Sequence, residues 1–126
     1  MSVPDTILAA MRRTNEIFDT EVVQKQNMDA LDRVYTAGAR ILPPGAPMME
    51  GRDQIKAFWQ AAIKSMGASS AKLSTVRAEA AGETIVEIGS ADLAVAGGTA
   101  TVKYVVHWKQ EDGAWKWHVD IWNPNA

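Results

Sequence analysis

Apolar residues recur at helical spacing near the start of the chain, which predicts a long first helix. Ser2, Pro4 and Asp5 form a typical helix start, with a capping side chain, an early proline and a carboxylate in the first turn. Thr14 and Asn15 interrupt the stripe at positions that also point inward. Each is either a satisfied polar group at the edge of the core or a side chain aimed into a cavity. The apolar stripe consists of Ile7, Leu8, Met11, Phe18 and Val22.

Two further helices are predicted before residue 68. Asn27 is a capping residue for a short helix from Met28 to Tyr35. A brief strand, Ala39 to Leu42, then runs into a proline-rich loop that cannot belong to a central strand. The third helix has the clearest pattern, and Gly67 ends it. Its apolar positions are Ile55, Phe58, Trp59, Ala62, Ile63 and Met66.

From residue 71 onward the apolar pattern changes to a period of two, which predicts four consecutive strands. They lie near 71–80, 83–95, 99–110 and 114–123, and Ala81-Gly82, Gly97-Gly98 and Asp112-Gly113 separate them. Helices followed by strands with hairpin-length connections indicate an α+β domain. We expect the three helices to cover one face of a strongly curved antiparallel sheet.

Composition and charge narrow the function classes. With 126 residues, of which 47% are hydrophobic and 22% charged, the chain fits one globular domain, 1–126. The chain has no cysteine, which excludes disulfides and thiolate chemistry. A net charge of -2 with scattered basic residues argues against nucleic acid. No signal peptide or membrane span is indicated, so the cytoplasm is the default location.

Most of the residues that could bind a ligand or take part in catalysis lie in the last predicted hairpin. Residues 104–123 contain four of the five tryptophans, both histidines and Asp120, and the Asp112-Gly113 turn brings the two strands together. These rings and titratable groups must therefore converge on the two faces of a small sheet. The hairpin is where we expect a ligand.

Several segments together resemble a known family. They are Tyr35 to Gly45, Glu50 to Trp59, Asp112 to Trp115 and Asp120 to Asn123. They are similar to the SnoaL-like branch of the nuclear transport factor two-like (NTF2-like) superfamily, which includes ketosteroid isomerase, cyclases and dehydratases. The similarity covers nearly the whole chain. The resemblance implies a cone-shaped domain with a ligand cavity and frequent homodimerisation through the outer sheet face. It implies the fold far better than the function.

The resemblance does not extend to the residues of ketosteroid isomerase. Its proton-shuttling aspartate falls on Pro43, its hydrogen-bond-donating aspartate on Val106, and its tyrosine near Asp19. None of these residues fills the role, for which the isomerase uses a carboxylate base with a tyrosine and a protonated aspartate. Ketosteroid isomerisation is therefore disfavoured.

The register of the last hairpin decides which way Asp120 points. If Gln110 pairs with Trp115 and the strands stay regular, His107, His118, Asp120 and Trp122 lie on the outer face and favour a dimer interface. A single bulge near His118 would instead turn His118, Asp120 and Trp122 toward the cavity, beside Val106 and Trp108. The bulged register is the one that we favour.

If Asp120 points into the cavity, its surroundings predict an acid–base role. Tryptophans around the carboxyl would desolvate it and raise its pKa, so that it could serve as a general acid or base, supported by His118 and Asn15. The alternative is a structural aspartate that bonds the backbone or His107. His107, His118 and Asp120 could also form a metal site with two histidines and one carboxylate, but no further ligand spacing supports it, and we expect no metal and no cofactor.

Two functions stay open. The first is a small-molecule-binding domain with an apolar, tryptophan-lined cavity for an apolar or carbonyl-bearing molecule. The second is a cofactor-free isomerase, cyclase or dehydratase with Asp120 and His118 as catalytic residues. The candidate ligand-binding residues are Asn15, Tyr35, Trp59, Tyr104, Val106, Trp108 and Trp122.

Overall fold

The helices of this protein differ in type along the first half of the chain. The computed structural model describes residues 2–126. Helix α1 (Asp5–Ile17) continues directly into a π-helical segment, η1 (Phe18–Gln24), so the two form one long first helix. A short 3-10 helix, η2 (Met28–Arg33), follows, and α2 (Arg52–Met66) is the third. Within residues 2–126, no helix has both the length and the apolar character needed to cross a bilayer.

Six strands form one sheet in the order β2-β1-β6-β5-β4-β3. The short strand β2 (Met49–Glu50) lies at one edge, and β3 (Ser70–Ala81) lies at the other. The remaining strands are β1 (Tyr35–Leu42), β4 (Thr84–Val95), β5 (Gly98–Glu111) and β6 (Ala114–Pro124). The sheet is mixed rather than antiparallel throughout, because β1 pairs parallel with β6. The chain allows this pairing because α2 and four further strands, β2 to β5, separate β1 from β6.

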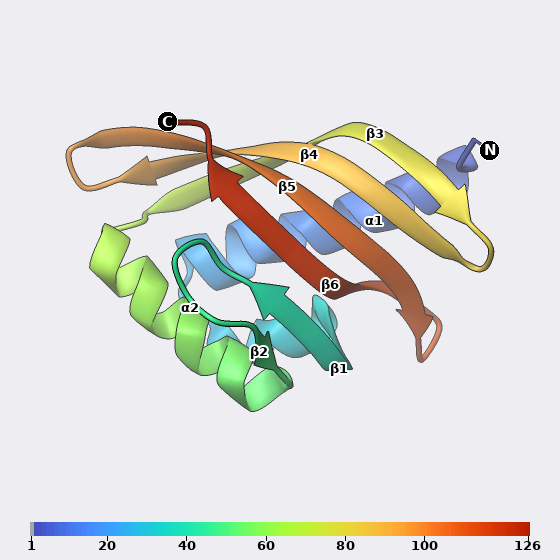
Figure 1. Cartoon of the computed structure of the whole chain (residues 1–126), viewed down its shortest axis with the longest axis horizontal. Helices are drawn as coiled ribbons and strands as arrows, with labels where there is room; N and C mark the ends of the chain where they lie inside the picture. Colours follow the sequence, from blue (N-terminus) through green and yellow to red (C-terminus); the bar gives the residue numbers. More distant parts are fainter. Residues whose placement is uncertain (1) are drawn as a thin grey trace.

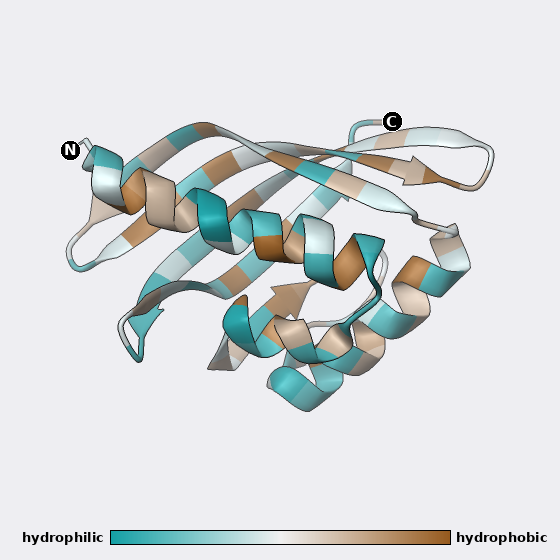
Figure 2. Cartoon of the chain, turned by 180° about the vertical axis from the view of Figure 1, so that it is seen from behind, coloured by the Kyte–Doolittle hydropathy of each residue, from teal (hydrophilic) through white to brown (hydrophobic). Residues whose placement is uncertain are grey.

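The sheet is strongly bent, and the helices lie on its concave side (Figure 1). Seen from behind in Figure 2, α1 runs across the long strands, along which hydrophobic and hydrophilic residues alternate. Helix α2 packs near β1 and β2. The inward residues of both layers form one buried core, which agrees with the predicted α+β cone.

Three local predictions were wrong in detail. The first helix is capped at Pro4 with no side-chain hydrogen bond, so Ser2 does not act as the cap. The second helix ends at Arg33 rather than Tyr35, because Tyr35 already begins β1 and pairs with Trp117. The first strand is therefore longer than the predicted 39–42. The four C-terminal strands agree with the prediction to within a residue or so at each end.

The β5–β6 hairpin contains the bulge near His118. Asp112 and Gly113 form its turn with φ values of 53° and 78°, the left-handed region that an Asp-Gly pair readily adopts. Gln110 pairs with Trp115 as predicted, and Trp108 pairs with Trp117, but His107 pairs with Val119. His118 is the extra residue. Beyond it, Asp120 pairs with Val106, and both side chains lie on the concave face.

Candidate functional site

An apolar pocket of about 80 Å³ lies between the sheet and the helices. This volume holds a molecule of several non-hydrogen atoms. Its wall comes from η1, α2 and strands β3 to β6, so the fold brings together residues from both ends of the chain. No Lys, Arg or His lines it within the described chain. The lining residues are Phe18, Trp59, Met66, Ala71, Leu73, Ala91, Leu93, Val102, Tyr104, Val106, Trp117, Asp120 and Trp122.

Asp120 is the one charged residue in this wall. Its side chain is buried, and its Oδ2 accepts a hydrogen bond of 2.6 Å from the Tyr35 hydroxyl. Trp59 Nε1 in turn donates to the Tyr35 oxygen at 3.1 Å. Within residues 2–126, no group donates to Asp120 Oδ1. The carboxyl thus has one oxygen held by the protein and one that is free to meet a ligand.

Burial raises the pKa of Asp120 to about 7. The hydrogen bond from Tyr35 opposes this shift, whereas the nearby charge of Glu87 adds to it. The same environment raises the pKa of Tyr35, first through burial and then through the charge of Asp120. Near neutral pH, therefore, Asp120 can hold or release a proton while Tyr35 remains a hydrogen-bond donor.

A second carboxylate, Glu87 on β4, is fully buried behind the pocket. Its Oε2 accepts from Thr75 Oγ1 at 2.7 Å and from the Tyr104 hydroxyl at 2.8 Å, and more distantly from Asn15 Nδ2 at 3.4 Å. Its Oε1 accepts from Trp108 Nε1 at 2.9 Å. Four donors and no cation surround this carboxyl, so its burial is compensated by hydrogen bonds alone.

Hydrogen bonds within the protein occupy most of the aromatic donors around the pocket. Besides the donors to Asp120, Tyr35 and Glu87, Trp117 Nε1 donates to Asn15 Oδ1 at 3.0 Å. Trp122 makes no side-chain hydrogen bond with any described residue, and its ring stacks on Trp59 with centroids 4.9 Å apart. The wall therefore presents aromatic faces and a carboxyl oxygen, and few free donors.

The structure divides the predicted site residues into two groups. Asp120, Trp59, Tyr104, Val106 and Trp122 line the pocket. Behind the wall, Tyr35 bonds Asp120, while Asn15 and Trp108 bond Glu87. These last three were predicted to contact the ligand directly, and none of them lines the pocket.

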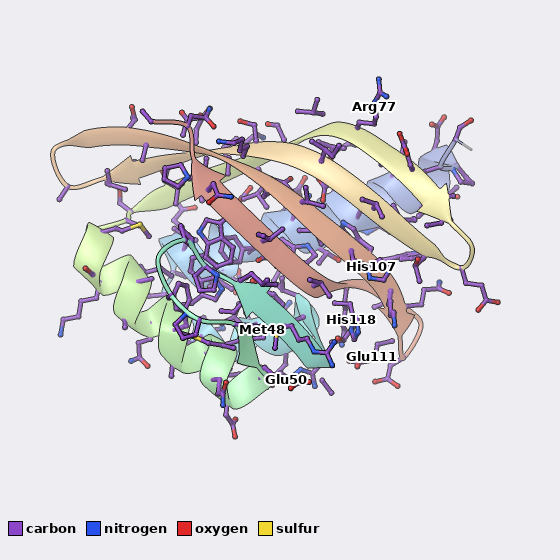
Figure 3. The ribbon with its side chains drawn as sticks, in the orientation of Figure 1. Met48, Glu50, Arg77, His107, Glu111 and His118 are labelled. Carbon is purple, nitrogen blue, oxygen red and sulfur yellow. The ribbon has the colours of Figure 1, made fainter. Side chains whose placement is uncertain are left out.

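His118 lies away from the pocket, contrary to the expectation that the bulge would turn it inward. As the bulged residue it stays on the convex side with His107, whose ring centroid is 6.1 Å away, and its Nδ1 lies 2.8 Å from Thr36 Oγ1. Figure 3 shows His107, His118 and Glu111 together near the β5–β6 turn. The two histidines and Asp120 are thus on opposite faces. Nowhere in residues 2–126 do three His, Cys, Asp or Glu side chains cluster as metal ligands would.

Sequence reasoning missed Glu87 and much of the pocket wall. A signal for Glu87 was present, because Ile85, Glu87, Gly89 and Ala91 alternate along one face of β4 and the other three are small or apolar. A charge at such a position indicates a buried polar cluster. Leu73, Leu93 and Val102 carry no comparable signal, since they are ordinary strand residues.

Solved structures of similar shape share the fold across almost the whole chain. A hexachlorocyclohexane dehydrochlorinase from Novosphingobium barchaimii is 15% identical with a TM-score of 0.79, over 96% of this chain and 88% of that one. A candidate dehydratase of the NTF2-like family from Streptomyces avermitilis is 14% identical with a TM-score of 0.77, over 98% and 99%. A Nostoc punctiforme protein of unknown function with a cystatin-like fold has 8% identity and a TM-score of 0.84, over 99% and 96%. At these identities the likeness shows the fold alone.

The sequence itself matches one family. No curated protein matches this chain. The model of the SnoaL-like domain, however, matches residues 15–118, which run from the last turn of α1 through the other helices and strands β1 to β5 to the bulge at His118 in β6. Together with the cone of three helices on a bent six-stranded sheet, this match shows that the chain belongs to the SnoaL-like domain family.

Proposed function

We propose that this protein binds a small molecule with an apolar body in the pocket, where Asp120 is its polar contact. The observation that carries the proposal is the carboxyl of Asp120, which stands in an otherwise apolar and aromatic wall with one oxygen free of protein donors. Such a combination of apolar surface and one convergent polar group is typical of small-molecule sites. The ligand's polar group would meet Oδ1.

The protonation state of Asp120 determines which polar groups of a ligand can bind to it. Below a pH of about 7 the protonated carboxyl donates, and a carbonyl oxygen of the ligand is a suitable acceptor. Above that pH the carboxylate only accepts, and it favours a donor or a positive charge. Both classes have an apolar body that fits the aromatic wall.

A titration of tryptophan fluorescence tests the binding proposal. Trp59, Trp117 and Trp122 line the pocket, so an occupant changes their surroundings. We expect small ketones, aldehydes or amines to produce a saturable change that persists in Asp120→Asn. The Asn side chain keeps an acceptor for Tyr35 and the shape of the wall. If no member of such a panel changes the emission, the pocket does not bind small molecules of this class.

Proton transfer is a second function, favoured by the position and the raised pKa of Asp120. As a carboxylate it would accept a proton from a carbon atom of the ligand, and as an acid it would return one, without a cofactor. Because Tyr35 and Tyr104 already donate to carboxylates, little is left to stabilise an oxyanion. Elimination or isomerisation without a strongly developed oxyanion therefore fits the site best.

Exchange of ligand protons for deuterium distinguishes binding from catalysis. In heavy water, a ligand with an acidic C–H bond would exchange that proton for deuterium faster in the presence of the protein than without it, and Asp120→Asn would lose this acceleration while keeping its affinity. The structural neighbours named for dehydrochlorination and dehydration agree with this chemistry. Equal exchange in both proteins would leave binding alone as the function.

The protein would act as a homodimer through the convex face of the sheet. Ile88, Val105 and Ile121 are direct cross-strand neighbours on β4, β5 and β6. Their exposed fractions are 45%, 40% and 39%, so they form a continuous apolar stripe. Such a stripe supports an interaction between two copies of the sheet.

A further inference from the structure

The polar groups of the pocket wall are acceptors much more than donors. Tyr104 lines the pocket but donates its hydroxyl to Glu87 at 2.8 Å, and Trp59 and Trp117 donate their indole N–H groups to Tyr35 and Asn15. The free oxygen of Asp120 remains. A ligand that enters this pocket as a hydrogen-bond acceptor would find few partners, whereas a donor would find one that is poorly solvated.

The charge around the pocket has one sign. The ionisable groups that face Asp120 are Tyr35 on β1, Tyr104 on β5 and Glu87 on β4, with Asp19 on η1 beyond Tyr104. None of them is a cation, and α2 contributes only Trp59 and Met66 to the wall. Asp120 and Glu87 repel each other, so a positive ligand would relieve a repulsion that no basic residue of the wall offsets.

Aromatic faces complete the wall. Trp59 and Trp122 are stacked, with centroids 4.9 Å apart and planes at 21°, and Phe18 packs on both Trp59 and Trp117 at 5.0 and 5.1 Å. The faces of such rings attract cations, and tryptophan does so best. An aromatic wall beside a carboxylate is the arrangement that general physical chemistry predicts for an organic cation.

We propose that the pocket selects a small organic ammonium ion, whose charge meets the carboxylate of Asp120 and whose apolar body lies against Trp59 and Trp122. The proposal rests on the proposed binding function and names its ligand class. The apolar body would gain from burial, and the ion pair with Asp120 would offset the cost of taking the ammonium group out of water.

The test compares isobutylammonium with isobutanol, which have the same carbon skeleton and number of non-hydrogen atoms. Their binding is followed through the tryptophan indole N–H signals in ¹⁵N NMR spectra at pH 6 and pH 8. The ammonium group stays charged at both values, since its pKa lies near that of lysine, about 10.4. Any change in its affinity with pH therefore comes from the protein.

We expect isobutylammonium to bind at least tenfold more tightly than isobutanol at pH 8. Its affinity should fall about tenfold at pH 6, because a group with a pKa of about 7 is about tenfold less deprotonated there. The affinity of isobutanol should be nearly the same at both pH values. Asp120→Asn should abolish both the preference for the ammonium ion and the pH dependence of its affinity. Trp122→Leu should lower the affinity for the ammonium ion more than the affinity for the alcohol.

Glu83→Gln is the matched control, since it removes one negative charge at the exposed β3–β4 turn and should change nothing. Equal affinities of the two compounds for the wild-type protein, or tighter binding of isobutanol, would overturn the ammonium proposal and leave the binding function standing. If neither compound shifts an indole signal, the ammonium proposal fails, and the fluorescence panel of ketones and aldehydes decides the binding function separately. The pH dependence of the affinity of the wild-type protein for isobutylammonium tests the ammonium proposal even if a variant does not fold.

Discussion

Two buried carboxyl residues, Asp120 and Glu87, differ in the hydrogen bonds that hold them. Asp120 is held by one hydrogen bond and faces a pocket, whereas Glu87 is held by four and faces none. The first arrangement leaves a group able to react or bind, and the second builds a rigid support for Tyr104 and Trp108. Similar burial thus produces different roles, because the number of donors differs.

The raised pKa of Asp120 predicts a dependence of stability on pH. Between about pH 4 and pH 7 the folded protein keeps a proton on Asp120 that the unfolded chain has released, so stability falls as pH rises through this window and is level above it. We expect Asp120→Asn to remove this component, on the order of a few kcal/mol. The check is urea unfolding of both proteins at pH 4.5 and pH 8. Parallel changes in the two proteins would contradict the prediction.

Replacing Glu87 should be costly even when its shape is preserved. In Glu87→Gln the NH₂ group faces either Trp108 Nε1, which can only donate, or the Thr75 and Tyr104 hydroxyls, whose own protons then lose their acceptor. A buried donor without an acceptor costs about 1–3 kcal/mol, and we expect a loss of that size in the free energy of unfolding. Glu83→Gln, at an exposed turn, should have no measurable effect. Equal stability of the two variants would mean that the Glu87 cluster is not essential.

At the scale of elements, the pairing of β4 with β5 depends on one glycine. Gly89 lies directly opposite Tyr104, and a Cβ at Gly89 would stand 2.1 Å from Tyr104 Cζ and 2.3 Å from its hydroxyl. The ring therefore lies across Gly89, which allows the hydroxyl to reach Glu87. The strand pair positions a pocket residue because a side chain is absent at this point.

Gly89→Ala should consequently displace Tyr104 and lower the free energy of unfolding by about 1–3 kcal/mol, the usual cost of overpacking. In the background of Tyr104→Leu the same change should cost much less, and a double-mutant cycle measures the difference. Gly38→Ala on β1 is the control, because nothing lies within 4 Å of its added Cβ. If the effects of Gly89→Ala and Tyr104→Leu simply add, the two residues are not coupled as described.

The elements were largely predictable, whereas the pairing that makes the site was only partly so. Helical spacing predicted α2, and alternation with Gly-containing turns predicted β3 to β6. The parallel pairing of β1 with β6 was missed, because it joins residues 79 to 82 positions apart and leaves no local pattern. The bulge at His118 was one of the two registers that the sequence left open, but no local pattern indicates that the His118 side chain lies beside Thr36.

At the scale of the whole molecule, the two faces of the sheet have separate roles. The concave face buries the core and the pocket, and the convex face carries the apolar stripe of Ile88, Val105 and Ile121. Because successive residues on a strand point to opposite faces, one strand serves both, as β5 does with Tyr104 inside and Val105 outside. The proposed dimer would thus leave the pocket untouched.

Val105→Lys should convert the proposed dimer to a monomer. It places a charge in the middle of the stripe, where a charge would have to be buried without a partner. Sedimentation velocity should show a dimer for the wild-type protein and a monomer for the variant. Gln110→Lys, at an exposed position near the end of the same strand, should remain a dimer. A monomeric wild-type protein would contradict the proposed interface.

Both proposed functions require Asp120 to be a buried carboxyl in the pocket wall that exchanges its proton near neutral pH. The most direct test is an NMR titration that follows the side-chain carboxyl carbon of Asp120, with Asp120→Asn to assign the signal. We expect a pKa of about 7, and a lower pKa when isobutylammonium is bound. A pKa near that of an ordinary aspartate, about 3.9, would show that the carboxyl is solvated and would rule out the proposed site.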